Sequence, residues 1–252
     1  MKTRYSAWLN GQALHDVAPA LYILDVIEKA PEGDVALAAY AGRDGQRVLR
    51  RSRQSLSVDV YFAIRDQDPT RRKAALEAVI AWAAPGGWLS LSDRPDQRLH
   101  VAMDRAPTIT SALKWTDTLI LTLTAYEVPF WEQAHPATAQ GEGAEGSATL
   151  FVPGTAPAAP LSYTARNTGA APLTTLTVEA AGRRITLTGL SIAPGETVSV
   201  TYDHTGLQLL PVDKRTEDSA DDILLPCGQR TGITWSADQS VAITFEARGR
   251  YL

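Results

Sequence analysis

The sequence is poor in the residues that build most metal and redox centres. Cys227 is the only cysteine among 252 residues, so no disulfide can form within the chain. The histidines are scattered, and none stands at a zinc-ligand spacing from another ligand; they are His15, His100, His135 and His204. We therefore expect exposed or half-buried histidines, and neither a metal site nor a bound cofactor.

Motifs of the common catalytic sites are also missing. The sequence contains no GxSxG nucleophile elbow, no GxxxxGK[ST] phosphate loop and no GxGxxG dinucleotide motif. A lone cysteine is more often a small buried apolar residue than a nucleophile, and we interpret Cys227 in that way. The sequence therefore predicts no catalytic residues and no enzymatic activity.

Long apolar stretches are absent as well. No run approaches 18 apolar residues, and the first residues lack the apolar core of a signal peptide. We expect synthesis and folding in a cytoplasm, without membrane insertion. The net charge is −4, and the acidic surplus lies in the second half of the chain. Bulk charge of this sign does not favour coating of nucleic acid or of anionic membranes.

What the sequence does contain is strand-like alternation in its first half. In residues 55–64 one face is apolar, and its members are Leu56, Val58, Val60, Phe62 and Ile64. Residues 115–126 place Leu119, Leu121 and Leu123 on one side and a Thr-rich face on the other, which we expect to be exposed. The first half is therefore expected to be built mainly from β-sheets.

One helix interrupts these strands. Asp68 can cap it, Pro69 suits the first helical position, and we predict a helix over 69–84 with Leu76, Val79, Ile80 and Ala83 along one stripe. After the Pro-Gly-Gly stop at 85–87, a strand at 88–91, a turn at 93–96 and a strand at 99–103 predict a hairpin. The stripe is expected to pack on the apolar face of 55–64.

The composition of the sequence changes after Trp131. Residues 134–147 are small, polar and Gly-rich, which indicates a linker or long loop. Eight short Thr/Val/Ile/Leu runs follow between turn residues, which indicates a β-sandwich or jelly roll. The expected fold is thus mainly β with one helix: an α+β domain over 1–133 and a sandwich over 134–252.

Two charged clusters stand out. The acidic residues Glu217, Asp218, Asp221 and Asp222 lack the spacing of a calcium loop, so a solvated loop is favoured over a cation site. The basic cluster consists of Arg43, Arg47, Arg50, Arg51 and Arg53. It can be an exposed loop leading into Ser55, a nucleic-acid patch without aromatic platforms, or a set of contacts between subunits.

The tryptophans are unevenly distributed. Five lie in the first half, at Trp8, Trp82, Trp88, Trp115 and Trp131, and the predicted sandwich holds only Trp235. Sugars stack on aromatic rings, but this distribution suits core packing better than a sugar-binding cleft in the sandwich.

Taken in order along the chain, several short stretches resemble the distal tail protein (Dit) family, the siphovirus-type tail components of long-tailed bacteriophages. They include Gly42–Gly45 with the following arginines, Ala81-Trp82, Gly87–Pro95, Val128–Trp131, Asn167–Pro172, Ile185–Leu190 and Ala247–Leu252. The resemblance covers nearly the whole chain and depends on the order and spacing of these stretches.

The resemblance implies a structural virion protein of the tail tip or baseplate hub. Its N-terminal domain would close into a homo-hexameric ring and its C-terminal domain would be a galectin-like β-sandwich. Implied partners are the tail tube protein, a tail-tip hub or tail-associated lysin-type protein, and a receptor-binding protein, with DNA passing through the ring without specific binding. The five arginines then become candidates for the subunit interface. The alternative is a virion carbohydrate-binding module, although the sandwich lacks the His-Asn-Pro-Arg and Trp-Glu residues of a galectin sugar site.

Overall fold

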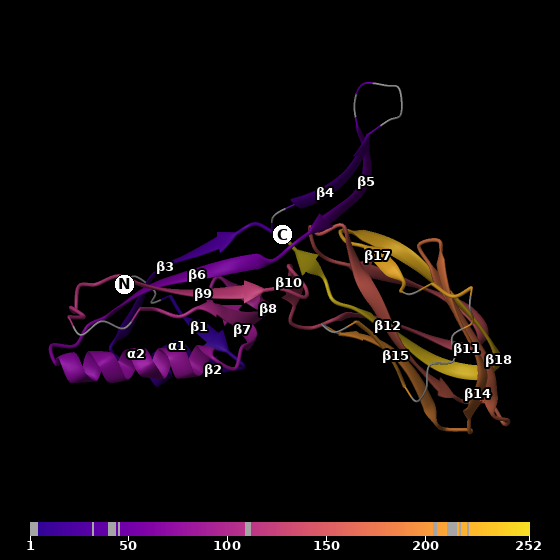
Figure 1. Cartoon of the computed structure of the whole chain (residues 1–252). Helices are drawn as coiled ribbons and strands as arrows, with labels where there is room; N and C mark the ends of the chain where they lie inside the picture. Colours follow the sequence, from indigo (N-terminus) through magenta and orange to yellow (C-terminus); the bar gives the residue numbers. More distant parts are fainter. Residues whose placement is uncertain are drawn as a thin grey trace. The chain divides into compact units, whose positions relative to one another are not determined.

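The computed structural model describes residues 5–31, 33–39, 44, 46–108, 112–203, 206–210, 216, 218–220 and 222–252, with the backbone alone for 50–52, 203 and 206–210. The described chain is mainly β and forms two compact units, Met1–Trp131 and Glu132–Leu252 (Figure 1). The boundary falls two residues before the one expected from the sequence. No helix among the described residues is long and apolar enough to cross a membrane.

The first unit is built on one antiparallel sheet. Its strands, in spatial order, are β2 (Gln12–Ala13), β1 (Ala7–Leu9), β7 (Gly87–Leu91), β8 (Arg94–Arg105), β9 (Leu119–Ala125), β6 (Leu56–Ile64) and β3 (Leu21–Lys29). The edge strand β3 therefore lies next to β6, and β6 pairs with β9 on its other side.

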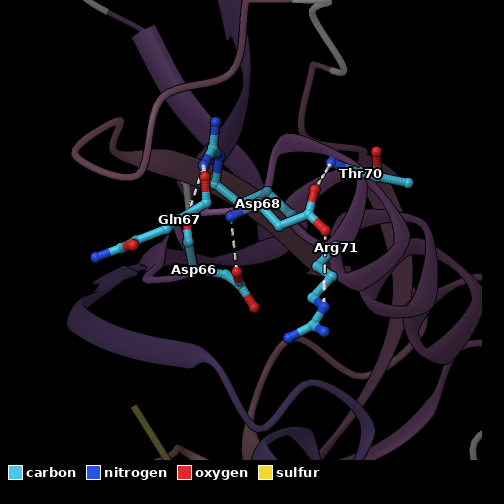
Figure 2. A network of polar contacts seen from close by, with 6 residues as sticks. Asp66, Gln67, Asp68, Thr70 and Arg71 are labelled. Atoms are coloured by element: carbon cyan, nitrogen blue, oxygen red, sulfur yellow. Dashed lines mark hydrogen bonds and ion pairs between the residues drawn. The ribbon is translucent and has the colours of Figure 1, made fainter.

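The helix predicted from the sequence is present as α2 (Pro69–Ala83), and a short helix, α1 (Leu14–Val17), precedes β3. The Asp68 carboxylate accepts from the backbone N–H of Thr70, which satisfies a donor of the first turn (Figure 2). α2 contacts β6, whose apolar face is fully buried, as are Leu76 and Val79 of the predicted stripe. Ile80 is only half-buried.

Two local predictions in the first unit are wrong. The face of Thr118, Ile120, Thr122 and Thr124 was expected to be exposed, and its first two residues are. Thr122 and Thr124 are buried, because hydrogen-bonding partners on β6 and neighbouring side chains cover them. The β7–β8 hairpin pairs Leu91 with Arg94, so its turn is Ser92-Asp93 and not the predicted 93–96. Strand pairing outweighs the turn preference of the Asp-Arg-Pro-Asp stretch.

The second unit is built mainly on one eight-stranded antiparallel sheet around one core. Its strands are β10 (Trp131–Gln133, which begins at the unit boundary), β11 (Ala137–Val152), β12 (Ala158–Asn167), β13 (Leu173–Ala180), β14 (Arg183–Ile192), β15 (Thr197–Asp203), β16 (Gly206–Leu210), β17 (Leu224–Pro226), β18 (Gln229–Ala247) and β19 (Arg250–Tyr251). All eight predicted runs lie in strands, but the last two share the long strand β18.

The strand β18 lies between β13 and β12 in the sheet of the second unit. Its first part pairs with β13 and its last part with β12, while β11 follows it along both parts. Alternate residues of β12, β13, β14 and β15 point into the common core, which includes Tyr163 and Phe245.

The predicted linker at 134–147 is wrong, because most of it is the strand β11. Gly141 and Gly146 face the indole of Trp235 on β18, and a Cβ on either glycine would overlap that ring. The indole is almost fully buried and its Nε1 donates to the Gly143 carbonyl at 3.3 Å. The glycines therefore accommodate a buried tryptophan and do not indicate a flexible segment.

Candidate subunit interface

The arginine cluster lies on a hairpin that is separate from the main sheet. β4 (Gly33–Ala39) pairs antiparallel with β5 (Gln46–Arg53), and these two strands form a sheet of their own. In Figure 1 the hairpin continues from the ends of β3 and β6. The interpretation of the cluster as a loop leading into Ser55 is therefore wrong, because the segment pairs as a strand.

The structure places the arginines unequally. Arg47 and Arg53 are exposed on β5, the backbones of Arg50 and Arg51 pair with Ala36 and Val35, and Arg43 lies outside the described residues. The Arg53 guanidinium lies 5.7 Å from the centre of the Phe130 ring, which is a cation–π distance. Arg53 therefore ties the base of the hairpin to the segment that precedes β10.

An apolar face on the hairpin was not identified from the sequence. Leu37 and Val48 are direct cross-strand partners, and Val35 shares their face because side chains alternate along β4. Their exposed fractions are 49%, 42% and 44%, and Leu49, the extra residue of the β-bulge, is 61% exposed. The alternation of Val35, Leu37 and Ala39 indicates a strand with one apolar face. Alternation does not show whether that face is buried or exposed.

A two-stranded hairpin gains little stability from its own contacts. Two isolated strands are marginally stable in water, and contiguous exposed apolar side chains mark contact surfaces. Within the described residues, no other strand pairs with β4 or β5. The hairpin therefore exposes an apolar face that no other described strand covers.

The edge strand next to the hairpin is fixed by a polar network on the sheet. Lys29 Nζ lies 2.7 Å from Asp59 Oδ2, and Thr122 Oγ1 donates to Asp59 Oδ1 at 2.7 Å. Burial alone would raise the pKa of Asp59, but the hydrogen bonds from Lys29 and Thr122 outweigh it and hold the pKa below its usual value. The same pairing raises the pKa of Lys29. The end of β3 that leads into β4 is therefore pinned to β6 and β9.

A second network joins residues from two of the stretches on which the family resemblance rests. Glu28 Oε1 accepts from Arg94 Nε at 3.0 Å, and Glu28 Oε2 accepts from Trp131 Nε1 at 2.7 Å. The Arg94 guanidinium also lies 5.1 Å from the centre of the Trp131 ring. These three side chains fix the β3 edge against the β7–β8 turn and Trp131.

The remaining candidate residues do not form a site. Asp222 pairs with Arg183, Asp218 is exposed, and Glu217 and Asp221 lie outside the described residues. In the described part of the chain, no three His, Cys, Asp or Glu side chains are grouped as metal ligands. Cys227 is a half-buried free thiol against the second core, and burial raises its pKa. His15 and His100 are half-buried, His135 is exposed, and His204 is outside the described residues.

Known proteins match this chain in structure but not in sequence. No family model matches the sequence, and no curated protein matches it. The Dit protein of phage SPP1, described as a hub of the adsorption apparatus in phages that infect Gram-positive bacteria, superposes with a TM-score of 0.69. The match covers 99% of this chain and 100% of that chain at 13% identity. The chain has the Dit fold.

Two further solved structures have a similar fold. A chain of the phage P2 baseplate in its activated conformation with Ca matches with a TM-score of 0.50, and one in the form with Sr matches with 0.51. Each match has 7% identity and covers 97% of both chains. The resemblance stated from the sequence is thus confirmed at the level of the fold.

Proposed function

We propose that this chain is a structural hub protein of a phage tail tip, in which six copies close into a ring between the tail tube and the tip proteins. Support comes from the Dit fold, which extends over nearly the entire length of the chain. We further propose that the first unit forms the ring and that the second is the galectin-like sandwich outside it. The protein would then act in the virion, after synthesis in the host cytoplasm.

The main support for a ring is the exposed surface of the hairpin β4–β5. Its apolar face at Val35, Leu37 and Val48 is exposed in the single chain, and its arginines add forked donors for carboxylates of a neighbour. In a closed ring each copy offers such an arm to the next copy through a heterologous contact. Docking on a neighbouring copy therefore both covers the arm and closes the ring.

The proposed partners follow from the position of such a ring. The tail tube protein would meet one face, and a tail-tip hub or tail-associated lysin-type protein, together with a receptor-binding protein, would be attached on the other side. DNA would pass through the bore without specific binding. The mechanism is assembly and geometry, so no chemical step is assigned to any residue.

The alternative function, glycan binding through the second unit, gains no support from the residues described there. Trp235 is the only tryptophan of that unit, and it is buried against Gly141 and Gly146. Its ring is therefore not available as a stacking platform.

Native mass spectrometry of the full chain, with a copy mass of 27.2 kDa, tests the ring. We expect a six-copy species and closed rings in electron micrographs. The double variant Leu37→Asp, Val48→Asp should lower the mass to that of one copy, because each new carboxylate would have to be desolvated at the contact. Phe151→Asp is the matched control, since Phe151 in the second unit has a similar exposure of 45%. A chain that stays single, even when mixed with isolated tail tubes, contradicts the proposal.

A further inference from the structure

A groove in the first unit lies beyond the end of β6, whereas the hairpin adjoins the start of β6. It has a volume of about 440 Å³ and is lined by Arg65, Asp66, Gln67 and Trp115. The first three residues connect β6 to α2, and Trp115 belongs to the segment before β9. Residues from two distant parts of the sequence therefore form its walls.

A single buried side chain joins the two walls. Arg72 of α2 is 7% exposed, and its Nε and Nη2 donate to the Leu113 carbonyl at 2.9 and 2.7 Å. Its Nη1 donates to the carbonyls of Asp66 and Gln67 at 2.6 and 3.0 Å. The five donors of a guanidinium are arranged to serve several acceptors at fixed angles. Arg72 therefore sets the distance between the walls before any ligand arrives.

Each wall is also fixed locally. Asp66 Oδ1 accepts from the Asp68 N–H at 2.8 Å, which orients its carboxylate beside the start of α2 (Figure 2). On the other wall, Lys114 N–H donates to Asp117 Oδ2 at 2.7 Å and Asp117 N–H donates to the Lys114 carbonyl at 3.1 Å. These bonds form a closed turn that carries Trp115. The groove is thus organised in advance, which lowers the entropic cost of binding.

Trp115 contradicts the expectation that the tryptophans of the first half pack in the core. Its exposed fraction is 56%, whereas Trp82 and Trp131 are buried. An indole on a fixed turn offers a large apolar surface to water, and burying it against a ligand is favourable. The ring therefore provides one flat apolar wall.

The polar groups of the groove set the kind of ligand. Arg65 is held with its guanidinium 4.8 Å from the centre of the Tyr22 ring, so its donors are directed by a cation–π contact. Asp66 supplies carboxylate acceptors and Gln67 supplies both a donor and an acceptor. One positive and one negative charge lie side by side, which disfavours a strongly charged ligand such as a phosphate.

We propose that this groove binds a pyranose unit of an uncharged glycan. A pyranose has an apolar face of C–H groups that fits against the Trp115 ring. Its hydroxyls both donate and accept hydrogen bonds, as Arg65, Asp66 and Gln67 require. A purely apolar peptide would displace water from these polar side chains without replacing the hydrogen bonds, which costs affinity. The inference is independent of ring assembly and assigns a ligand to the first unit.

Saturation-transfer NMR on the full chain tests the proposal, because it observes the ligand and works for one copy or for a ring. The probes are the methyl glycosides of glucose, galactose, mannose, N-acetylglucosamine and rhamnose. We expect saturable transfer to the C–H protons of at least one glycoside. Trp115→Ala should weaken its binding about tenfold or more, and Trp115→Phe should retain part of it. Asp66→Asn, which keeps the shape of the side chain, should weaken it as well.

The matched control is Tyr126→Ala, since Tyr126 is an equally exposed aromatic residue at 57% outside the groove. It should bind the glycoside as the unaltered chain does, and Trp115→Ala should leave the oligomeric mass unchanged. Two outcomes overturn the proposal: no saturable transfer to any of the five glycosides, or transfer that persists in Trp115→Ala. Failure of the ring proposal would instead appear in the mass of the unaltered chain, with glycoside binding intact.

Discussion

The indole of Trp235 lies against the backbone of Gly141, where the Cβ of any other residue would overlap it. Gly146 lies further along β11 and faces the same ring. We predict that Gly141→Ala and Gly146→Ala each lower the free energy of unfolding by about 1–3 kcal/mol, because the core must rearrange around an added methyl group. Thermal unfolding monitored by circular dichroism measures the change.

Gly232→Ala is the control for these two glycines. Gly232 lies on β18 near Trp235, but a Cβ there would meet no atom within 4 Å. Alanine should be neutral or stabilising by up to about 1 kcal/mol, because it restricts the unfolded chain. Equal unfolding temperatures for Gly141→Ala and Gly232→Ala would show that the indole does not require the glycine.

The hydroxyl of Tyr163 is buried without compensation. Tyr163 is 1% exposed in the second core, and its Oη has no hydrogen-bond partner among the described residues. Burial raises its pKa, so the phenol stays protonated. We predict that Tyr163→Phe raises the free energy of unfolding by about 1–3 kcal/mol, because an unpaired polar group leaves the core.

The same substitution at Tyr126 should act in the opposite direction. Tyr126 Oη donates to Asp104 Oδ1 at 2.7 Å on the surface, so Tyr126→Phe loses a bond and gains nothing. Its cost should stay below about 1 kcal/mol, because the group is exposed. Denaturant unfolding of both variants gives the two signs, and a destabilised Tyr163→Phe would mean that its hydroxyl is in fact paired.

The pairing of Asp59 with Lys29 and Thr122 predicts how stability depends on pH. The folded pKa of Asp59 is depressed, so its contribution is present above the unfolded pKa of about 3.9 and is lost as pH falls through the folded value. We expect Asp59→Asn to cost about 1–2 kcal/mol at neutral pH and to flatten the acid side of the stability profile. If the variant kept the acid slope of the unaltered chain, another carboxylate would be responsible for it.

Elements that are determined by neighbouring residues could be predicted from the sequence. Elements that depend on residues far away in the chain could not. The alternation of β6 and the Asp68-Pro69 start of α2 depend on neighbouring residues, so both could be predicted. The strand β11 could not, because its glycines are required by Trp235, which lies about ninety positions later. The hairpin was identified only by its arginines, and the exposure of Leu37 and Trp115 depends on what the fold leaves uncovered.

The arginines of the hairpin predict a salt-dependent part of assembly. We expect the triple variant Arg47→Ser, Arg50→Ser, Arg51→Ser to fold normally and to form a weaker ring, because each exposed pair with a neighbour contributes only about 1 kcal/mol but recurs at every contact. Raising the salt concentration should weaken the unaltered ring in the same way, since exposed charges are screened. Arg53 is left unchanged in this variant, because it contacts Phe130 in its own chain.

Salt also separates the arginines from the apolar face of the hairpin. The double variant Leu37→Ser, Val48→Ser should weaken the ring at every salt concentration, because burial of apolar surface is not screened. Native mass spectrometry and sedimentation over a salt series should therefore give two patterns. The apolar variant should lose hexamer to the same extent at every salt concentration, and the hexamer fraction of the arginine variant should no longer depend on salt. If the arginine variant keeps both its hexamer and the salt response of the unaltered chain, the cluster is solvated and the apolar face alone makes the contact.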